Sequence, residues 1–128
     1  MQNQSTDQHS PSDFWLARAF SGLMGIGVGL GAFGAHALKE SRTPAQLETW
    51  KTATLYVLIH ALAGAVLSLP TFRMPRASLY MFLFGCIVFG GSLYALVLMQ
   101  ISLLGAITPF GGLMFILGWL NLALRLGR

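Results

Sequence analysis

The feature that most constrains this chain is a run of 48 residues, Ala77 to Leu124, that contains no Asp, Glu, Lys or Arg. A straight helix of that length would extend about 72 Å, more than twice the bilayer hydrocarbon thickness of about 30 Å. The run must therefore fold back on itself. Because lipid offers no partner for open backbone groups, each half must be helical. The sequence thus predicts two membrane-spanning helices in this part alone.

Polar and turn-forming residues mark the point where this run reverses: Gln100, Ser102, Gly105, Thr108 and Pro109. Thr108 followed by Pro109 is typical of a helix N-cap with proline at the first helical position. We therefore expect a third span over about 77–98 and a fourth span over about 109–124.

A second charge-free stretch, Phe20 to Leu38, carries six glycines. In water this content would disfavour a helix by about 1 kcal/mol per glycine relative to alanine. In a bilayer, small residues instead let neighbouring helices approach closely. We expect a first span over about 14–38, with Gly25 and Gly29 on one packing face and Gly27 and Gly31 on another. The predicted helix-packing glycines are Gly25, Gly27, Gly29, Gly31 and Gly34.

The segments around the first span predict where helices begin. Residues 1–12 are polar and without periodicity, which favours a disordered tail ahead of a single transmembrane domain over 13–128. Ser10-Pro11-Ser12-Asp13 has a capping-box pattern, so the first helix is expected to start near Ser12. Ala35-His36-Ala37 imitates a signal-peptidase site, but the long polar segment before it disfavours cleavage.

A second span is expected over about 52–69. Thr43-Pro44-Ala45-Gln46 has the pattern of a second helix start, with Thr as N-cap and Gln at the third position. Pro70 is expected to end that helix, and Pro75 to begin the next one.

The sequence therefore predicts an all-α, four-span transmembrane helix bundle. The basic side chains fall five on one side and three on the other: Arg18, Arg73, Arg76, Arg125 and Arg128 against Lys39, Arg42 and Lys51. The positive-inside rule then predicts that the N- and C-termini are both cytoplasmic. The net charge of +4 is spread over segment ends without forming a patch, which argues against nucleic acid as a partner.

Two histidines lie in or beside the spans, and an ionisable residue at membrane depth suggests function. His60 is in the middle of the second span, and we expect its ring to point into the bundle and bond Ser92 or Tyr94. With the predicted topology, a polar cluster would gather in the outward half, under the 39–51 loop. Its members are His36, Tyr56, His60, Ser92, Tyr94 and Thr108. Hydrogen bonds between helices explain such residues more simply than catalysis.

No pattern of metal ligands or cofactor motif is recognisable, and two histidines without a carboxylate or thiolate at fixed spacing do not form a ligand set. The sequence therefore favours a non-enzymatic packing or assembly protein, with lipid and a second copy or another membrane protein as partners. Two alternatives stay open. One is a small oligomeric transporter or proton-conducting protein that uses His60. The other is a membrane enzyme or lipid-binding protein that uses a His36/His60 cluster.

Four motifs make a more specific comparison possible. They are GAFGAH at 31–36, YVLIHALA at 56–63, GSLY at 91–94, and TPFGG at 108–112 followed by Gly118-Trp119. In order and spacing they resemble the YgdD/YwdK-like family of small inner-membrane proteins, a family of unknown function. The likeness covers about residues 20–124. It implies a four-helix, multi-pass protein of the bacterial cytoplasmic (inner) membrane, and it implies no activity, cofactor or catalytic residue.

Overall fold

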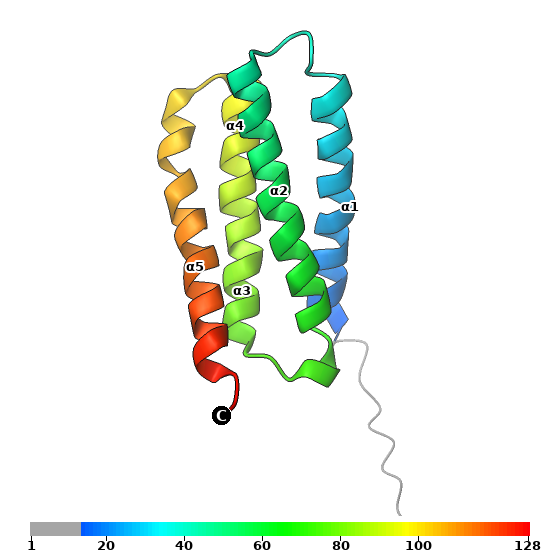
Figure 1. Cartoon of the computed structure of the whole chain (residues 1–128), viewed down its shortest axis with the longest axis vertical. Helices are drawn as coiled ribbons and strands as arrows, with labels where there is room; N and C mark the ends of the chain where they lie inside the picture. The colour runs from blue at the N-terminus through cyan, green and yellow to red at the C-terminus, as the bar shows by residue number, and fades with distance from the viewer. Residues whose placement is uncertain (1–13) are drawn as a thin grey trace, which may run out of the picture.

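The computed structural model describes residues 14–128, so the predicted tail at 1–12 and the capping box at Ser10–Asp13 lie outside the described residues. Four long apolar helices run alternately up and down (Figure 1). They cover Trp15–His36, Pro44–Leu67, Arg76–Met99 and Ser102–Arg125, and each is long and apolar enough to cross a membrane. The predicted all-helical, four-span architecture is therefore confirmed. The beginning of α1 (Trp15–His36) and the end of α5 (Thr108–Arg125) lie at the same end of the molecule.

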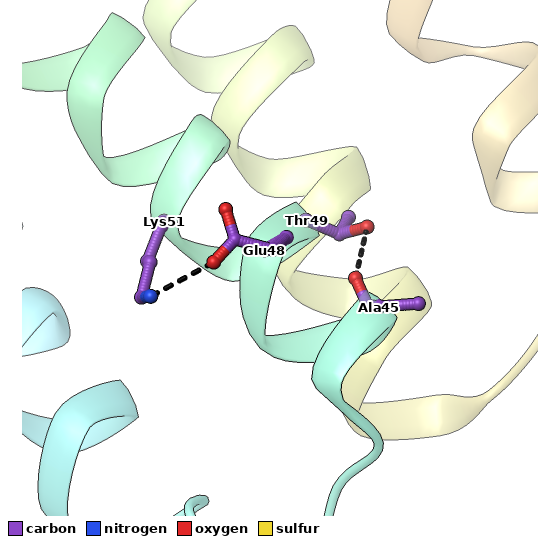
Figure 2. Close-up of polar contacts among 4 residues, drawn as sticks. All are labelled: Ala45, Glu48, Thr49 and Lys51. Atoms are coloured by element: carbon purple, nitrogen blue, oxygen red, sulfur yellow. Dashed lines mark hydrogen bonds and ion pairs between the residues drawn. The ribbon is translucent and has the colours of Figure 1, made fainter.

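Helix α2 (Pro44–Leu67) begins where its capping signal predicts. The Gln46 backbone N–H donates to Thr43 Oγ1 at 3.2 Å, and the Thr43 N–H donates to Gln46 Oε1 at 2.9 Å. Figure 2 shows the polar first turns, in which Lys51 donates to Glu48 and the Thr49 hydroxyl donates to the Ala45 carbonyl. The helix is thus about two turns longer than its expected span, because it starts with an exposed polar segment.

The connection from α2 to the third span contains a short 3-10 turn, η2 (Pro70–Phe72). Arg73 follows it with a left-handed backbone at φ 48°, and Pro75 is the N-cap of α3 (Arg76–Gly85). The prediction that Pro75 starts the third helix is confirmed.

The third span contains a π-helical turn that the sequence does not predict. Helix α3 passes through η3 (Cys86–Gly90) into α4 (Gly91–Met99). Neighbouring helices approach the backbone closely here: Phe89 main-chain atoms lie where a side chain on Gly111 would be, and Val57 fills the corresponding position at Gly90. A π-helical turn is wider than an α-helical turn, so it changes the position of the main chain at this point of close contact.

The reversal after the third span begins at the predicted place. Gln100 ends α4 with a left-handed backbone at φ 56°, and a 3-10 segment, η4 (Ser102–Ala106), leads into α5. The prediction that Thr108 is an N-cap is wrong, because Ile107 occupies that position and Thr108 is already helical. The Thr108 hydroxyl is within 2.7 Å of Ser92 Oγ instead, so it joins two spans.

The interior divides into two regions. The larger buried cluster joins all four spans: Leu16, Phe20, Ala61, Leu79, Phe82, Cys86 and Phe115. A smaller one lies at the opposite end and contains Leu38, Trp50 and Val97. Helix α1 packs chiefly on α2, and α3 packs chiefly on α5. As a result, one long side of α1 contacts no other helix of the monomer (Figure 1).

Candidate functional site

His60 is the only histidine among the described residues that is buried, and both of its ring nitrogens are hydrogen-bonded. Nδ1 lies 2.7 Å from the Tyr56 carbonyl one turn earlier, and Trp119 Nε1 lies 3.0 Å from Nε2. A carbonyl can only accept and an indole N–H can only donate. The ring is therefore the neutral tautomer that carries its hydrogen on Nδ1.

Aromatic side chains surround this ring on two further spans. Phe115 of α5 stacks on it with ring centroids 3.6 Å apart and planes at 10°. Phe82 of α3 presents an edge at 5.6 Å and also packs on Trp119 at 4.7 Å. His60 is thus fixed by stacking as well as by two hydrogen bonds, and it connects α2 to α5.

The expectation that His60 bonds Ser92 or Tyr94 is wrong, although the ring does point into the bundle as expected. Its partner is Trp119 on the fourth span, a residue that the sequence analysis did not include in the polar cluster. A signal was available, because Phe115 and Trp119 are four residues apart and lie on one face of α5. That aromatic face of α5 packs against the face of α2 that carries Tyr56 and His60.

A groove of about 690 Å³ opens beside this group. Tyr56, His60, Phe89, Pro109 and Trp119 are among its lining residues, and α2, η3 and α5 form its walls. The Tyr56 ring stacks on Phe89 at 4.8 Å, and the Tyr56 hydroxyl makes no hydrogen bond within residues 14–128. The groove can therefore receive a flat apolar group, whereas His60 has no free nitrogen to offer it.

The structure does not bring the other predicted polar residues into one cluster. Thr54 donates to the Trp50 carbonyl at 3.0 Å, so Tyr94, at 2.8 Å, is the donor to Thr54 Oγ1. Ser92 donates to the Phe89 carbonyl at 3.1 Å and so accepts from Thr108. His36 is exposed at the end of α1, and its side chain has no hydrogen-bond partner in the described part of the chain. Tyr94–Thr54 and Ser92–Thr108 are thus two separate hydrogen bonds between helices, and the His36 side chain belongs to neither.

The predicted packing glycines fall into two groups. Gly27, Gly31 and Gly34 face α2, where an added Cβ would lie 2.8 Å from Leu58, 3.3 Å from Thr54 and in contact with the Trp50 indole, respectively. Gly25 and Gly29 face outward, and a Cβ on either would meet no atom within 4 Å. Only one of the two predicted faces is therefore covered within the monomer.

Two residues that the sequence analysis did not include among the site residues hold the opposite end together. Trp50 is buried and donates from Nε1 to the Leu30 carbonyl at 2.7 Å, across the α1–α2 interface. Arg42 donates from Nε to the Val97 carbonyl at 3.0 Å, and thereby satisfies a backbone oxygen at the end of α4. An arginine six residues after the end of α1 is a weak signal, since its partner is 55 residues away.

Among residues 14–128, no group of three or more His, Cys, Asp or Glu side chains is placed to hold a metal ion. The only Cys, Cys86, is buried in the larger core cluster. The chemistry around His60 is thus a set of hydrogen bonds and aromatic contacts between helices, beside an open and mostly apolar groove.

Comparison with known proteins supplies the family. The family described as "Protein of unknown function (DUF423)" matches residues 30–112, which include the first three of the four motifs and the fourth as far as Gly112. The chain belongs to this family. A UPF0382 membrane protein of Staphylococcus epidermidis is 39% identical over 115 residues, which cover 87% of this chain and 92% of that relative. The UPF0382 membrane protein YwdK of Bacillus subtilis is 42% identical over 101 residues, 74% of this chain and 81% of the relative.

The DUF423/UPF0382 family extends beyond bacteria. A UPF0382 membrane protein of Schizosaccharomyces pombe is 37% identical over 112 residues, 82% of this chain and 93% of its own length. No solved structure matches the chain significantly. The relatives and the four apolar helices together identify a multi-pass membrane protein of the DUF423/UPF0382 family, and the family description names no activity.

Proposed function

We propose that this protein is a non-enzymatic packing and assembly component of a membrane, and that it associates with a second copy of itself through the outer side of α1. The observation that carries the proposal is the outward small-residue face made by Ser21, Gly22, Gly25 and Gly29. A Cβ added to any of its three glycines would meet no atom within 4 Å.

The chemistry of α1 favours a second copy as the occupant. Ser21, Gly25 and Gly29 are each four residues apart, which is the small-xxx-small spacing that allows two membrane helices to approach closely. The same face on a second chain is complementary to it about a two-fold axis. Lipid chains could fill this surface, but they would gain less packing there than a rigid, matching helix.

The geometry around His60 supports a structural role over proton transfer. Both ring nitrogens are engaged, and a second proton at Nε2 would have to displace the Trp119 indole. Transport through His60 therefore lacks an observation in its favour.

We further propose that the protein resides in a bacterial cytoplasmic membrane with both termini in the cytoplasm. The bacterial relatives support the choice of membrane. The distribution of basic side chains supports the orientation, with five at the end that holds the start of α1 and the end of α5 and three at the other. An alkaline phosphatase fusion at the C-terminus should be inactive, and a green fluorescent protein fusion should be bright. High phosphatase activity would contradict this orientation.

Cysteine crosslinking in native membranes tests the proposed dimer. In a Cys86→Ser background, Ser21→Cys should form a disulfide-linked dimer under mild oxidation. Leu120→Cys is the matched control, because it is exposed on α5 within about two turns of the same end of the molecule. Gly25→Leu, added to Ser21→Cys, should reduce the crosslink several-fold without unfolding the monomer. Equal crosslinking at Ser21→Cys and Leu120→Cys would mean random collision and would refute the proposal.

A further inference from the structure

Two adjacent hollows lie at the end of the molecule where α2 leads into α3. One, of about 260 Å³, lies between the start of α1 and the 68–76 connection, and Arg73 and Arg76 line it. The other, of about 300 Å³, lies between the connection and the end of α5, and Arg73, Arg125 and Arg128 line it. Arg73 and Met74 belong to both hollows. Four arginines thus converge around two neighbouring depressions.

Within the described chain, no acidic side chain compensates the charge at this end. Arg73, Arg76, Arg125 and Arg128 are all exposed, and none of their side chains makes a hydrogen bond or ion pair within residues 14–128. The two acidic residues described, Glu40 and Glu48, lie at the opposite end. A guanidinium group presents a planar fork of N–H donors that matches phosphate oxygens, so this end is complementary to phosphate.

The backbone at Arg73 turns the chain between the two hollows. Its φ of 48° is left-handed, a conformation that glycine adopts at little cost and arginine does not. Arg73 ends η2 in this conformation, as Gln100 ends α4, so the conformation marks a chain reversal. Arg73 is also the one arginine that lines both hollows.

We propose that this end binds the headgroup of an anionic phospholipid that carries two phosphate groups. Arg73 lies between the phosphates, Arg76 contacts one, and Arg125 and Arg128 contact the other. The exposed apolar side chains beside the hollows, Leu69 and Leu126, accept the first carbons of the acyl chains. Basic residues at span ends also set topology, but topology does not require them to converge on two joined hollows. The site lies within one monomer, so it does not depend on the proposed dimer.

Native mass spectrometry of the full chain in detergent, titrated with cardiolipin, tests this site. Phosphatidylglycerol, with one phosphate, and uncharged phosphatidylcholine are the comparison lipids. We expect cardiolipin to bind at least tenfold more tightly than phosphatidylglycerol. Arg73→Gly should reduce cardiolipin binding at least tenfold while its melting temperature stays equal or rises, because glycine relieves the left-handed strain.

Arg18→Gln is the matched control, since it removes one positive charge at the same end but outside both hollows. It should change cardiolipin binding less than twofold. Arg125→Gln, an exposed position in the second hollow, should weaken binding as Arg73→Gly does and provides a second test. Equal losses for Arg18→Gln and Arg73→Gly, or equal affinity for cardiolipin and phosphatidylglycerol, would overturn the proposal in favour of non-selective attraction.

Discussion

Gly34 should tolerate no side chain, because the Trp50 indole occupies the space that a Cβ would need. An ideal Cβ on Gly34 would contact Cδ1 and Nε1 of the ring and lie 3.1 Å from Cγ. The ring cannot move cheaply. It is 1% exposed, donates to the Leu30 carbonyl at 2.7 Å, and packs on Tyr94 with ring centroids 4.5 Å apart. Gly34→Ala is therefore expected to destabilise the bundle.

The magnitude follows from three effects. Overpacking of a filled site costs about 1–3 kcal/mol. Displacing the indole would also weaken its hydrogen bond, which is worth about 0.5–1.5 kcal/mol. The greater helix propensity of alanine returns at most about 1 kcal/mol. We expect Gly34→Ala to lower the free energy of unfolding by about 1–3 kcal/mol.

Unfolding in mixed micelles of a mild detergent and dodecyl sulfate, followed by tryptophan fluorescence, measures this change. Gly25→Ala is the matched control, because a Cβ there meets no atom within 4 Å, and its stability should be unchanged or slightly greater. In a Trp50→Leu background the flexible side chain can yield, so Gly34→Ala should cost much less. Equal stability of the Gly34→Ala and Gly25→Ala proteins would refute the reasoning.

Two further predictions use the same unfolding assay, and a third uses thiol labelling. His60→Leu should lower the free energy of unfolding by about 1–3 kcal/mol, because it leaves the Trp119 indole N–H without its acceptor. His60→Gln should lower it less, because an amide can still accept and donate, and equal losses would mean that stacking alone matters. Arg42→Gln should lower the free energy of unfolding by about 1–2 kcal/mol, because it removes a charged donor from the Val97 carbonyl, and Arg42→Lys should recover part of that loss. An unchanged unfolding midpoint would show that water replaces the guanidinium freely. Cys86 should react with a maleimide only after unfolding, since 3% of its surface is exposed, and rapid labelling of the folded protein would contradict its burial.

Local features of this fold were predictable from the sequence, and relations between helices were less so. The Thr43 capping box, the helix start after Pro75 and the reversal at Gln100 each depend on a few neighbouring residues. The partner of His60 depends instead on how α5 is rotated about its own axis, and no local pattern in the sequence specifies that rotation. Tyr94 and Ser92 were recognised as polar residues at membrane depth. Their actual partners, Thr54 and Thr108, follow from the packing of whole helices.

The π-helical turn at Cys86–Gly90 makes the third span sensitive to chain length as well as to residue type. A π-helical turn, with its i→i+5 hydrogen bonds, holds about one residue more than an α-helical turn. Deleting one residue from Cys86–Gly90 would therefore restore a regular α-helical turn and leave Tyr94 and Ser92 facing Thr54 and Thr108, while Phe82 would keep its contact with Trp119. Inserting one residue instead would rotate all of α4 by about 100° relative to α3, because each residue of an α-helix advances the rotation by that angle. A one-residue insertion, unlike a deletion, would thus separate the two halves of a single helix into correct and incorrect registers without changing its hydrophobicity.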